Sequence, residues 1–187
     1  MRELLNGSIE RRAYVALLLS LRAIYLELER SLQQRTPDLL ALGVDLPDLR
    51  RVAALEADLA AWTSAGGVEG ASPAPAALAY AERIGGLGVS GVHRLLAHAY
   101  VRYLGDLHGG QVLSRLLRER FALGPEGTRF YEFGDAERVL AWRHTIREAL
   151  GAARLDQRRC DEVVAEALWA FDAHCTIFEQ LGGGAAP

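Results

Sequence analysis

The fold of this chain is decided by the stretch His98-Ala-Tyr-Val-Arg-Tyr-Leu-Gly-Asp-Leu-His-Gly-Gly-Gln-Val-Leu113. Apolar residues at helical spacing predict one long helix from Val92 to Leu123. These apolar residues are Leu95, Leu96, Leu104, Val112, Leu113, Leu116 and Leu117. Glycines occupy positions 105, 109 and 110 in the middle of that helix. Each interior glycine costs about 1 kcal/mol relative to alanine, and the three together cost roughly 3 kcal/mol, so a bare backbone must be required there.

The three glycines share one face of the predicted helix with Asp106, because successive residues are rotated by about 100°. Arg102 and His98 lie one and two turns before this face. Such a surface can admit a large flat ligand, or it can let a second helix cross closely. A carboxylate that faced a tight helix crossing would need buried partners of its own. Asp106 therefore favours the ligand over the helix crossing.

The composition excludes several classes of function and partner. The chain has 187 residues, half of them hydrophobic, which is enough for one domain with a substantial core. Its net charge of -3 and its lack of a basic run interleaved with aromatic residues argue against nucleic acid and anionic membranes as partners. The apolar run Ala13 to Leu21 is shorter than a membrane span and is followed by Arg22, so we expect no membrane span and no signal peptide. Cys160 and Cys175 lack CxxC spacing, and we expect reduced thiols that serve packing in a cytoplasmic protein.

Helical periodicity and capping residues predict an all-α, single-domain fold of roughly six main helices. The predicted helices run from Ser8 to about Gln34, Leu39 to Leu42 (a short turn), Asp48 through Trp62, Pro75 to Ile84, Val92 to Leu123, Asp135 to about Leu150, and Asp156 to about Leu181. In the third of these, Val52, Leu55, Leu59 and Trp62 form an apolar stripe. Only Thr128 to Gly134 has extended character, and Gly124-Pro125 is expected to stop the long helix. We expect a helical domain over residues 1–181 and a flexible tail over 182–187.

Several common chemistries lack their motifs in this sequence. The glycine-rich stretch does not follow a predicted strand and lacks the Lys-Ser/Thr pair of a phosphate-binding loop. No HxxxH or HxxE pair indicates a helical metal site. No nucleophile-elbow pattern supports a serine hydrolase. The glycine-lined face is the feature that remains.

That stretch strongly resembles the distal-helix signature HAYxRYLGDLxGGQ of the biliverdin-forming heme oxygenases. The resemblance extends along nearly the whole chain. It includes Tyr25 with the Leu-Glu that follows, Ala54-Leu-Glu-x-Asp-Leu59 before Trp62, Pro75 with Tyr80, and Phe178-Glu179. It implies the heme oxygenase fold and the cleavage of heme to biliverdin, ferrous iron and carbon monoxide. Heme would be both substrate and cofactor, O2 the oxidant, and a reductase (a ferredoxin or a flavoprotein) the electron donor.

The resemblance also implies roles for particular residues. In this family heme lies between a proximal and a distal helix, and the glycines that bring the distal backbone against the macrocycle match Gly105, Gly109 and Gly110. Asp106 matches the aspartate that orders water at the site of oxygen activation.

Further side chains match the supporting polar network of the family, namely Tyr25, Tyr80 and Arg102. Where the family commonly has an amide on the last helix, this chain has His174, so we expect a pH-dependent charge there. Arg143 aligns with the basic residue that meets a heme propionate, and Arg138, one or two turns earlier, would assist it.

The proximal iron ligand is the main departure from the family. The family's proximal histidine belongs to an H-x-x-A-E-like segment before the first helix, and no histidine precedes His93 in this chain. Either an N-terminal segment is missing from the chain, or the protein is a member without the usual ligand. His108 is a poor substitute, because it projects about 130° away from the glycine face and is expected to pack against a neighbouring helix. His93 and His144 are expected to be surface or capping residues.

Two functions are consistent with these observations. The first is a heme oxygenase, supported by the complete set of Tyr25, Tyr80, Arg102 and Asp106, which heme storage would not need. The second is a non-catalytic heme or tetrapyrrole binder, or a scaffold of the same fold, supported by the missing histidine. Resemblance of fold does not decide between them.

Overall fold

The structure is a computed structural model that describes residues 9–122 and 126–182, and over these ranges it is helical without a β-strand. The all-α class predicted from the sequence is confirmed. The α-helices are α2 (Arg11–Gln34), α3 (Thr36–Ala41), α4 (Val52–Ser64), α5 (Pro75–Gly85), α6 (Leu95–Ala99), α7 (Gly105–Phe121), α8 (Ala136–Gly151) and α9 (Gln157–Gly182). Two 3-10 turns, η1 (Val89–Arg94) and η3 (Arg129–Tyr131), and one π-helical turn, η2 (Tyr100–Leu104), complete the described elements. The expected flexible tail was 182–187; Gly182 is the last residue of α9, and 183–187 lie outside the described residues.

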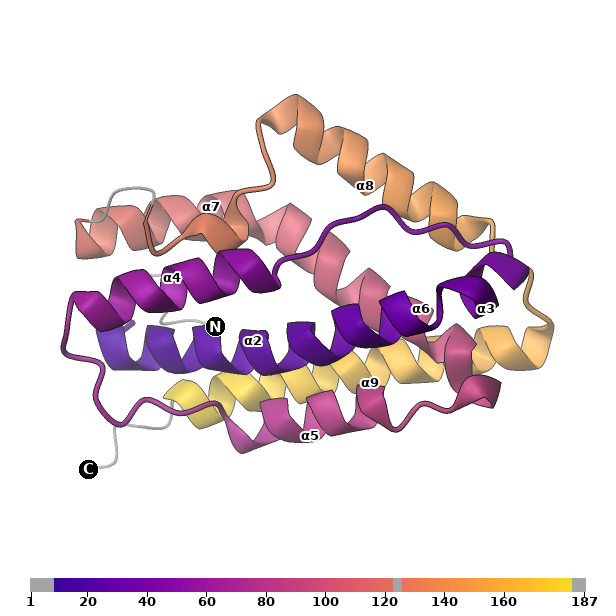
Figure 1. Ribbon diagram of the computed structural model, residues 1–187, viewed down its shortest axis with the longest axis horizontal. Coiled ribbons are helices and arrows are strands. Elements are labelled where there is room, and N and C mark those ends of the chain that lie inside the picture. Colours follow the sequence, from indigo (N-terminus) through magenta and orange to yellow (C-terminus); the bar gives the residue numbers. More distant parts are fainter. Residues whose placement is uncertain (1–8, 123–125, 183–187) are drawn as a thin grey trace.

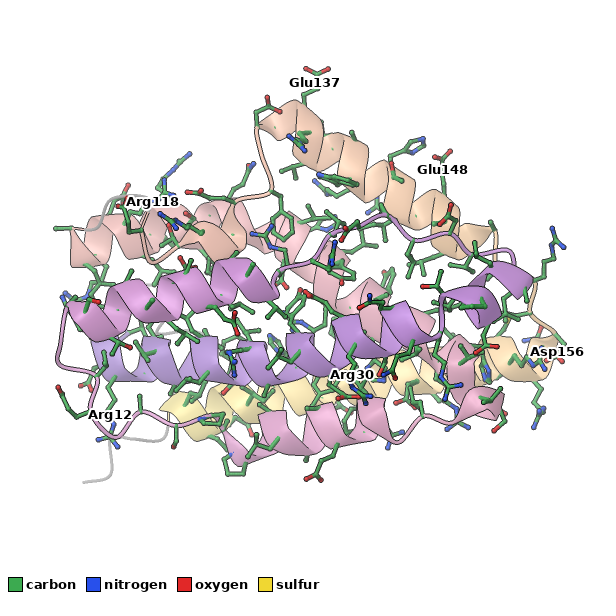
Figure 2. The ribbon with its side chains drawn as sticks, in the orientation of Figure 1. Arg12, Arg30, Arg118, Glu137, Glu148 and Asp156 are labelled. Carbon is green, nitrogen blue, oxygen red and sulfur yellow. The ribbon has the colours of Figure 1, made fainter. Side chains whose placement is uncertain are left out.

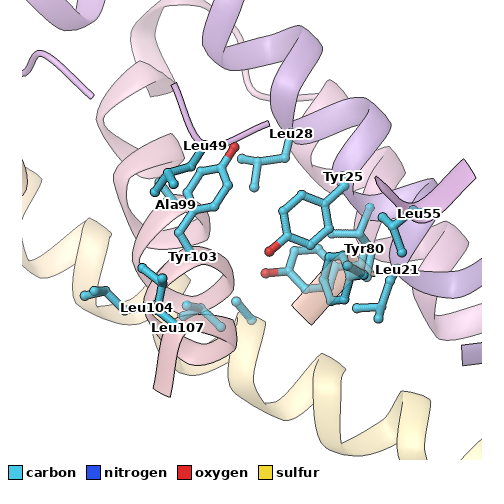
Figure 3. Close-up of a cluster of buried hydrophobic side chains, with 14 of the residues drawn as sticks. Leu21, Tyr25, Leu28, Leu49, Leu55, Tyr80, Ala99, Tyr103, Leu104 and Leu107 are labelled. Atoms are coloured by element: carbon cyan, nitrogen blue, oxygen red, sulfur yellow. The ribbon is translucent and has the colours of Figure 1, made fainter. Parts of the chain in front are cut away.

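Helix α2 is the centre of the packing. It contacts α4, α5, α6 and α9, and Figure 1 shows α4 on one side of it and α5 and α9 on the other. Its buried face includes Leu18, Ile24 and Leu28, each fully buried, and Figure 3 shows Leu28 beside Tyr103 in the central cluster. The predicted stripe on α4 also meets this core, with Leu55 and Trp62 fully or almost fully buried. Charged side chains such as Arg12, Glu137 and Asp156 point outward (Figure 2). Removal of this apolar surface from water is the main driving force for the fold.

The predicted long helix around the glycines is not one uniform α-helix. Its hydrogen-bond pattern changes from 3-10 (η1) to α (α6), then to π (η2), and back to α at Gly105. A π turn inserts an extra residue into the helix, and such turns often occur at functional sites. The helix ends at Phe121, one residue before Ala122, which has a left-handed φ of 51°. The expected stop at Gly124-Pro125 lies outside the described residues.

The predicted helix starts were partly correct. Asp135 caps α8 by accepting from the Arg138 backbone N–H at 2.8 Å. Asp156 accepts from the Arg159 backbone N–H at 2.8 Å just before α9. The proposed cap at Ser8 lies outside the described residues.

The predicted cap of α4 at Asp48 was wrong. The Asp48 carboxylate instead pairs with the Arg50 guanidinium at 2.8 and 2.6 Å. Glu29 of α2 satisfies the start of α4, because its Oε1 accepts from the backbone N–H groups of Arg51 and Val52 at 2.5 and 3.2 Å. A carboxylate supplied by a neighbouring helix makes a local cap unnecessary.

The extended character expected for Thr128 to Gly134 is seen at Glu132, but Arg129–Tyr131 form the 3-10 turn η3 instead. The buried carboxylate of Asp58 on α4 accepts from the backbone N–H groups of Arg129 and Phe130, each at 2.8 Å. These hydrogen bonds hold the turn, and the Phe130 ring is fully buried against the rings of Tyr25 and Tyr131. The turn therefore depends on a residue distant in the sequence.

Candidate active site

A cavity of 550 Å³ lies between α2, the η2–α7 segment and α9. Its apolar wall includes Leu17, Leu21, Val101, Leu113, Phe171 and Phe178. Its polar side chains include Arg102, Asp106 and His174. A mostly apolar cavity with a few convergent polar groups is typical of a ligand site.

Two of the three glycines open onto this cavity. A Cβ atom added to Gly105 or Gly109 would meet no heavy atom within 4 Å, apart from the chain neighbours and the helix's own backbone. Gly110 faces the protein interior instead, where an added Cβ would lie 3.1 Å from Cδ1 of Tyr131. Two glycines thus expose bare backbone to the cavity, and the third allows close packing.

Asp106 is held in a fixed orientation at the cavity wall. Arg102 Nη2 donates to both of its carboxylate oxygens at 2.9 Å, and the Tyr25 hydroxyl also donates to it. The Arg102 and Tyr25 side chains are almost fully buried, whereas the Asp106 side chain is 11% exposed. Burial, and next the charge of Asp106, raise the pKa of Tyr25 well above its ordinary value, so its phenol keeps its proton. Burial opposes the charge on Arg102, but Asp106 and Tyr25 more than offset this and raise its pKa.

His174 lies beside this pair as an uncharged imidazole. Its Nδ1 is 3.0 Å from Arg102 Nη1, and its ring contacts that of Phe178. Burial, and next the positive charge of Arg102, lower the pKa of His174 from 6.5 to about 2. The pH-dependent charge expected at this position is therefore wrong, because the imidazole stays neutral at ordinary pH.

Tyr80 belongs to a second polar cluster behind the cavity. Its hydroxyl is 3.2 Å from His98 Nδ1, and His98 Nε2 is 3.1 Å from Glu166 Oε1. Arg83 binds the same carboxylate at 2.6 and 2.9 Å. His98 was expected on the glycine face, but it does not line the cavity and its ring nitrogens contact Tyr80 of α5 and Glu166 of α9 instead. Sequence reasoning missed Glu166, for which no local motif gives a signal.

Arg138 and Arg143, the predicted propionate contacts, lie on α8 and do not line the cavity. The Arg138 side chain is exposed near Gly134. Arg143 is partly buried, and among the described residues its Nε has no hydrogen-bond partner. The structure does not bring these arginines to the cavity, and their role stays a prediction.

The remaining histidines also lie away from the cavity. His108 Nδ1 is 2.5 Å from the Leu104 carbonyl oxygen, and its Nε2 is 3.3 Å from Arg147 on α8. His144 is exposed, as expected. The expected surface or capping role of His93 was wrong, because its side chain is buried and lies 2.6 Å from Glu162 on α9.

The two cysteines differ in their surroundings. Cys160 is partly buried, but Cys175 is exposed and lines the cavity next to His174. The packing role expected for Cys175 was therefore wrong.

Over residues 9–122 and 126–182, no group of three or more histidine, cysteine or acidic side chains could hold a metal ion. No helix in the described part of the chain is long and apolar enough to cross a bilayer.

An all-α fold with a bare-backbone slot beside a held carboxylate defines a helical protein that binds a large flat ligand. The chain belongs to the heme oxygenase family, whose family model matches residues 1–180. The heme oxygenase 1 of Synechocystis is 31% identical over 96% of this chain and 75% of the relative, and that of Pongo abelii is 32% identical over 97% of this chain and 64% of the relative.

Solved structures agree with this assignment. The crystal structure of Synechocystis heme oxygenase-1 in complex with heme has a TM-score of 0.86 at 31% identity, covering 97% of this chain and 82% of that chain. The heme oxygenase of Leptospira interrogans has a TM-score of 0.84 at 28% identity, covering 95% of this chain and 87% of that chain. The fold predicted from the sequence resemblance is confirmed.

Proposed function

We propose that this protein is a heme oxygenase, which cleaves heme to biliverdin, ferrous iron and carbon monoxide with O2 and electrons from a reductase. Membership of the family supports the reaction. The observation that carries the proposal is the Asp106 carboxylate, fixed by Tyr25 and Arg102 at the wall of a glycine-lined cavity. A protein that only stores heme needs the slot but not an oriented carboxylate within it.

The cavity suits heme in shape and polarity. A flat apolar macrocycle requires a wall without side chains over its face, and the open space above Gly105 and Gly109 provides one. Phe171 and Phe178 on α9 add aromatic surface to the same cavity. Bound heme supplies the iron at which oxygen is activated. Arg138 and Arg143 are our candidates for its propionates, as cations on the neighbouring helix α8.

We assign proton handling to Asp106. An ionised carboxylate accepts hydrogen bonds and donates none. Arg102 and Tyr25 already donate to that of Asp106 from the protein side. Its exposed part faces the cavity, where it would accept a hydrogen bond from a water molecule and hold that water in place as the proton donor for the reaction. Tyr25 and Arg102 are positioning residues, and neutral His174 and Tyr80 complete the surrounding network.

The axial ligand of the iron is not assigned. Of the histidines in the described residues, only His174 lines the cavity, and it lies beside Arg102 near Asp106. His108 faces α8 and is not proposed as a ligand. A test of function therefore includes free imidazole as an external ligand.

The test is a hemin titration of the full chain with excess imidazole, followed by a reductant in air. Wild type should bind hemin, and its Soret band should bleach into a biliverdin spectrum. Asp106→Asn, which keeps the side-chain shape, should bind hemin with little biliverdin formed. The control is Glu82→Gln, which alters an exposed carboxylate on α5 outside the cavity and should behave as wild type. Unchanged biliverdin formation by Asp106→Asn would remove the proposed role of Asp106, and binding without turnover by wild type would favour the non-catalytic binder.

We also propose that a ferredoxin or a flavoprotein supplies the electrons, as the family resemblance implies. A cytoplasmic location is proposed from the two free cysteines, Cys160 and Cys175. Comparison of turnover with ferredoxin and with a flavoprotein reductase tests the first of these points.

A further inference from the structure

The side chains of Tyr80, His98, Glu166 and Arg83 form a polar cluster behind the heme cavity, between α5, α6 and α9. None of the four lines that cavity. Tyr80 and His98 are fully buried, and the Glu166 side chain is 3% exposed. Trp169 of α9 packs against the cluster, because its ring contacts those of Tyr80 and His98 and its centre lies 4.2 Å from the guanidinium carbon of Arg83. A buried polar cluster whose members have partners is rigid, so its hydrogen bonds keep one direction.

The carboxylate of Glu166 decides which nitrogen of His98 carries hydrogen. Although burial opposes it, donation from His98 and Arg83 lowers the pKa of Glu166 to about 2, so the group is ionised at neutral pH. An ionised carboxylate has no hydrogen to give, and His98 Nε2, which is 3.1 Å away, must therefore be the donor. A neutral imidazole has one N–H group, which leaves Nδ1 as an acceptor. The Tyr80 hydroxyl, 3.2 Å from Nδ1, then donates to His98.

The direction of the Tyr80 hydroxyl affects Arg102. With its hydrogen turned to His98, the Tyr80 oxygen presents lone pairs to its other neighbours. Arg102 acts on this oxygen, because burial raises the pKa of Tyr80 and the charge of Arg102 is the first influence that opposes burial. The Arg102 side chain is 3% exposed, and among the described residues its buried Nε has no hydrogen-bond partner. Lone pairs nearby stabilise a buried cationic N–H group of this kind.

We propose that Glu166 is a positioning residue for the oxygenase reaction, an inference that rests on the function proposed above. Glu166 fixes the ring hydrogen of His98 on Nε2, and through His98 it fixes the direction of the Tyr80 hydroxyl. The Tyr80 oxygen then faces Arg102, which holds Asp106 at the cavity wall. Figure 3 shows this hydroxyl pointing to the same side of the core as that of Tyr25, the other residue that donates to Asp106.

The opposite arrangement is unfavourable at both ends of the cluster. With hydrogen on His98 Nδ1, the lone pair of Nε2 would face the Glu166 carboxylate at 3.1 Å. The Tyr80 hydroxyl would accept from His98 and turn its own hydrogen toward the Arg102 cation. Two repulsive contacts would then replace two attractive ones in a dry interior, where electrostatic interactions are strong.

The first test is heteronuclear NMR of the histidine rings in the full chain without heme, at pH 8. The spectra distinguish rings with hydrogen on Nε2, on Nδ1 or on both, and His98→Gln identifies the His98 signals. Wild type should carry this hydrogen on Nε2 alone. In Glu166→Gln a single oxygen must serve both Arg83 and His98, while the amide can donate to Nε2, so rings with hydrogen on Nδ1 should appear. Hydrogen on Nδ1, or on both nitrogens, in wild type would overturn the proposal.

The matched control for this test is Glu162→Gln. Glu162 lies one turn before Glu166 on α9 and is likewise bound to a buried histidine, with 2.6 Å between its Oε2 and His93 Nε2. It has no hydrogen bond to Tyr80 or His98 among the described residues. Glu162→Gln should therefore leave the His98 signals unchanged, whereas a general loosening of α9 would alter them in both variants.

The second test is a double-mutant cycle on the rate of biliverdin formation from bound hemin. Glu166→Gln and Tyr80→Phe should each lower the rate about tenfold, the effect of one lost hydrogen bond, and leave hemin affinity unchanged. The combined variant should be no slower than either alone, because both changes act through the same hydroxyl. Glu162→Gln should react as wild type.

Additive losses in the cycle would overturn the proposal. So would a wild-type rate in Tyr80→Phe, which keeps the buried ring and answers the question even if Glu166→Gln does not fold. A wild type that forms no biliverdin would refute the proposed function and the positioning role with it. The NMR result is obtained without heme, so the direction of the hydrogen bonds is decided separately from the oxygenase activity.

Discussion

Replacement of Glu166 by glutamine would test the polar cluster behind the heme cavity. The Glu166 side chain is 3% exposed and is bound by Arg83 at 2.6 and 2.9 Å and by His98 Nε2 at 3.1 Å. Burial by itself raises the pKa of this carboxyl, but hydrogen bonds and charges from His98 and Arg83 outweigh burial. The pKa of Glu166 is therefore lowered from 4.5 to about 2.

The lowered pKa of Glu166 determines how much stability Glu166→Gln loses and over which pH range. At 1.36 kcal/mol for each pKa unit, the change from 4.5 to about 2 corresponds to about 3 kcal/mol of folding free energy. Arg83 is 40% exposed, so water screens part of its charge, and we expect a loss of about 2 kcal/mol for Glu166→Gln at pH 7. Because the folded pKa lies below the unfolded one, this stabilisation is complete above about pH 4.5 and is lost as the pH falls toward 2.

Urea unfolding of wild type and Glu166→Gln at pH 7 and at pH 3 measures the loss of stability and its dependence on pH. The difference in unfolding free energy should be about 2 kcal/mol at pH 7 and clearly smaller at pH 3. The control is Glu148→Gln, which removes another glutamate paired with a histidine, but with side chains 66% and 74% exposed, and should change stability by less than about 0.5 kcal/mol. An equal difference at both pH values would show that the carboxylate charge is not the cause, and the reasoning would fail.

Further predictions concern the glycines, the imidazole and the buried aspartate. Gly109→Ala should raise the unfolding free energy of the heme-free chain by about 1 kcal/mol, because its Cβ meets no atom, yet it should weaken hemin binding in an optical titration. Gly110→Ala should show no such gain in urea unfolding, because its Cβ would lie 3.1 Å from Tyr131. His174→Asn should leave the pH profile of biliverdin formation between pH 5 and 8 unchanged, since a pKa of about 2 keeps the imidazole neutral there, and a shifted profile would contradict this. Asp58→Ala should cost roughly 3 kcal/mol in urea unfolding, because two backbone N–H groups at 2.8 Å lose their acceptor.

Local structure that depends on residues close together in the sequence could be predicted. The caps at Asp135 and Asp156 act on backbone groups three residues later, so composition and spacing are enough to find them. The start of α4 and the turn η3 could not be predicted, because Glu29 and Asp58 act across the fold on segments distant in the sequence. Local propensity yields to such tertiary contacts whenever a buried carboxylate supplies the hydrogen bonds.

The same distinction applies to the candidate site. Arg102 and Asp106 are four residues apart, so their contact at 2.9 Å follows from helical spacing. The neutral state of His174 does not follow from the sequence, because it results from burial beside Arg102 in the folded chain. The partners of Tyr80 required His98 and Glu166 to meet between α6 and α9, which no local pattern indicates.

The π turn is the largest departure from the predicted helix. Uniform helical spacing placed His98, Arg102 and Asp106 on a single face. The structure separates them, since His98 lies 3.1 Å from Glu166 and away from the cavity, while Arg102 stays with Asp106 at the heme cavity. Irregular turns of this kind often occur at functional sites, and here the turn carries Arg102 and leads directly to Gly105. Gly105 and Gly109 then leave the cavity wall bare where a flat substrate must approach.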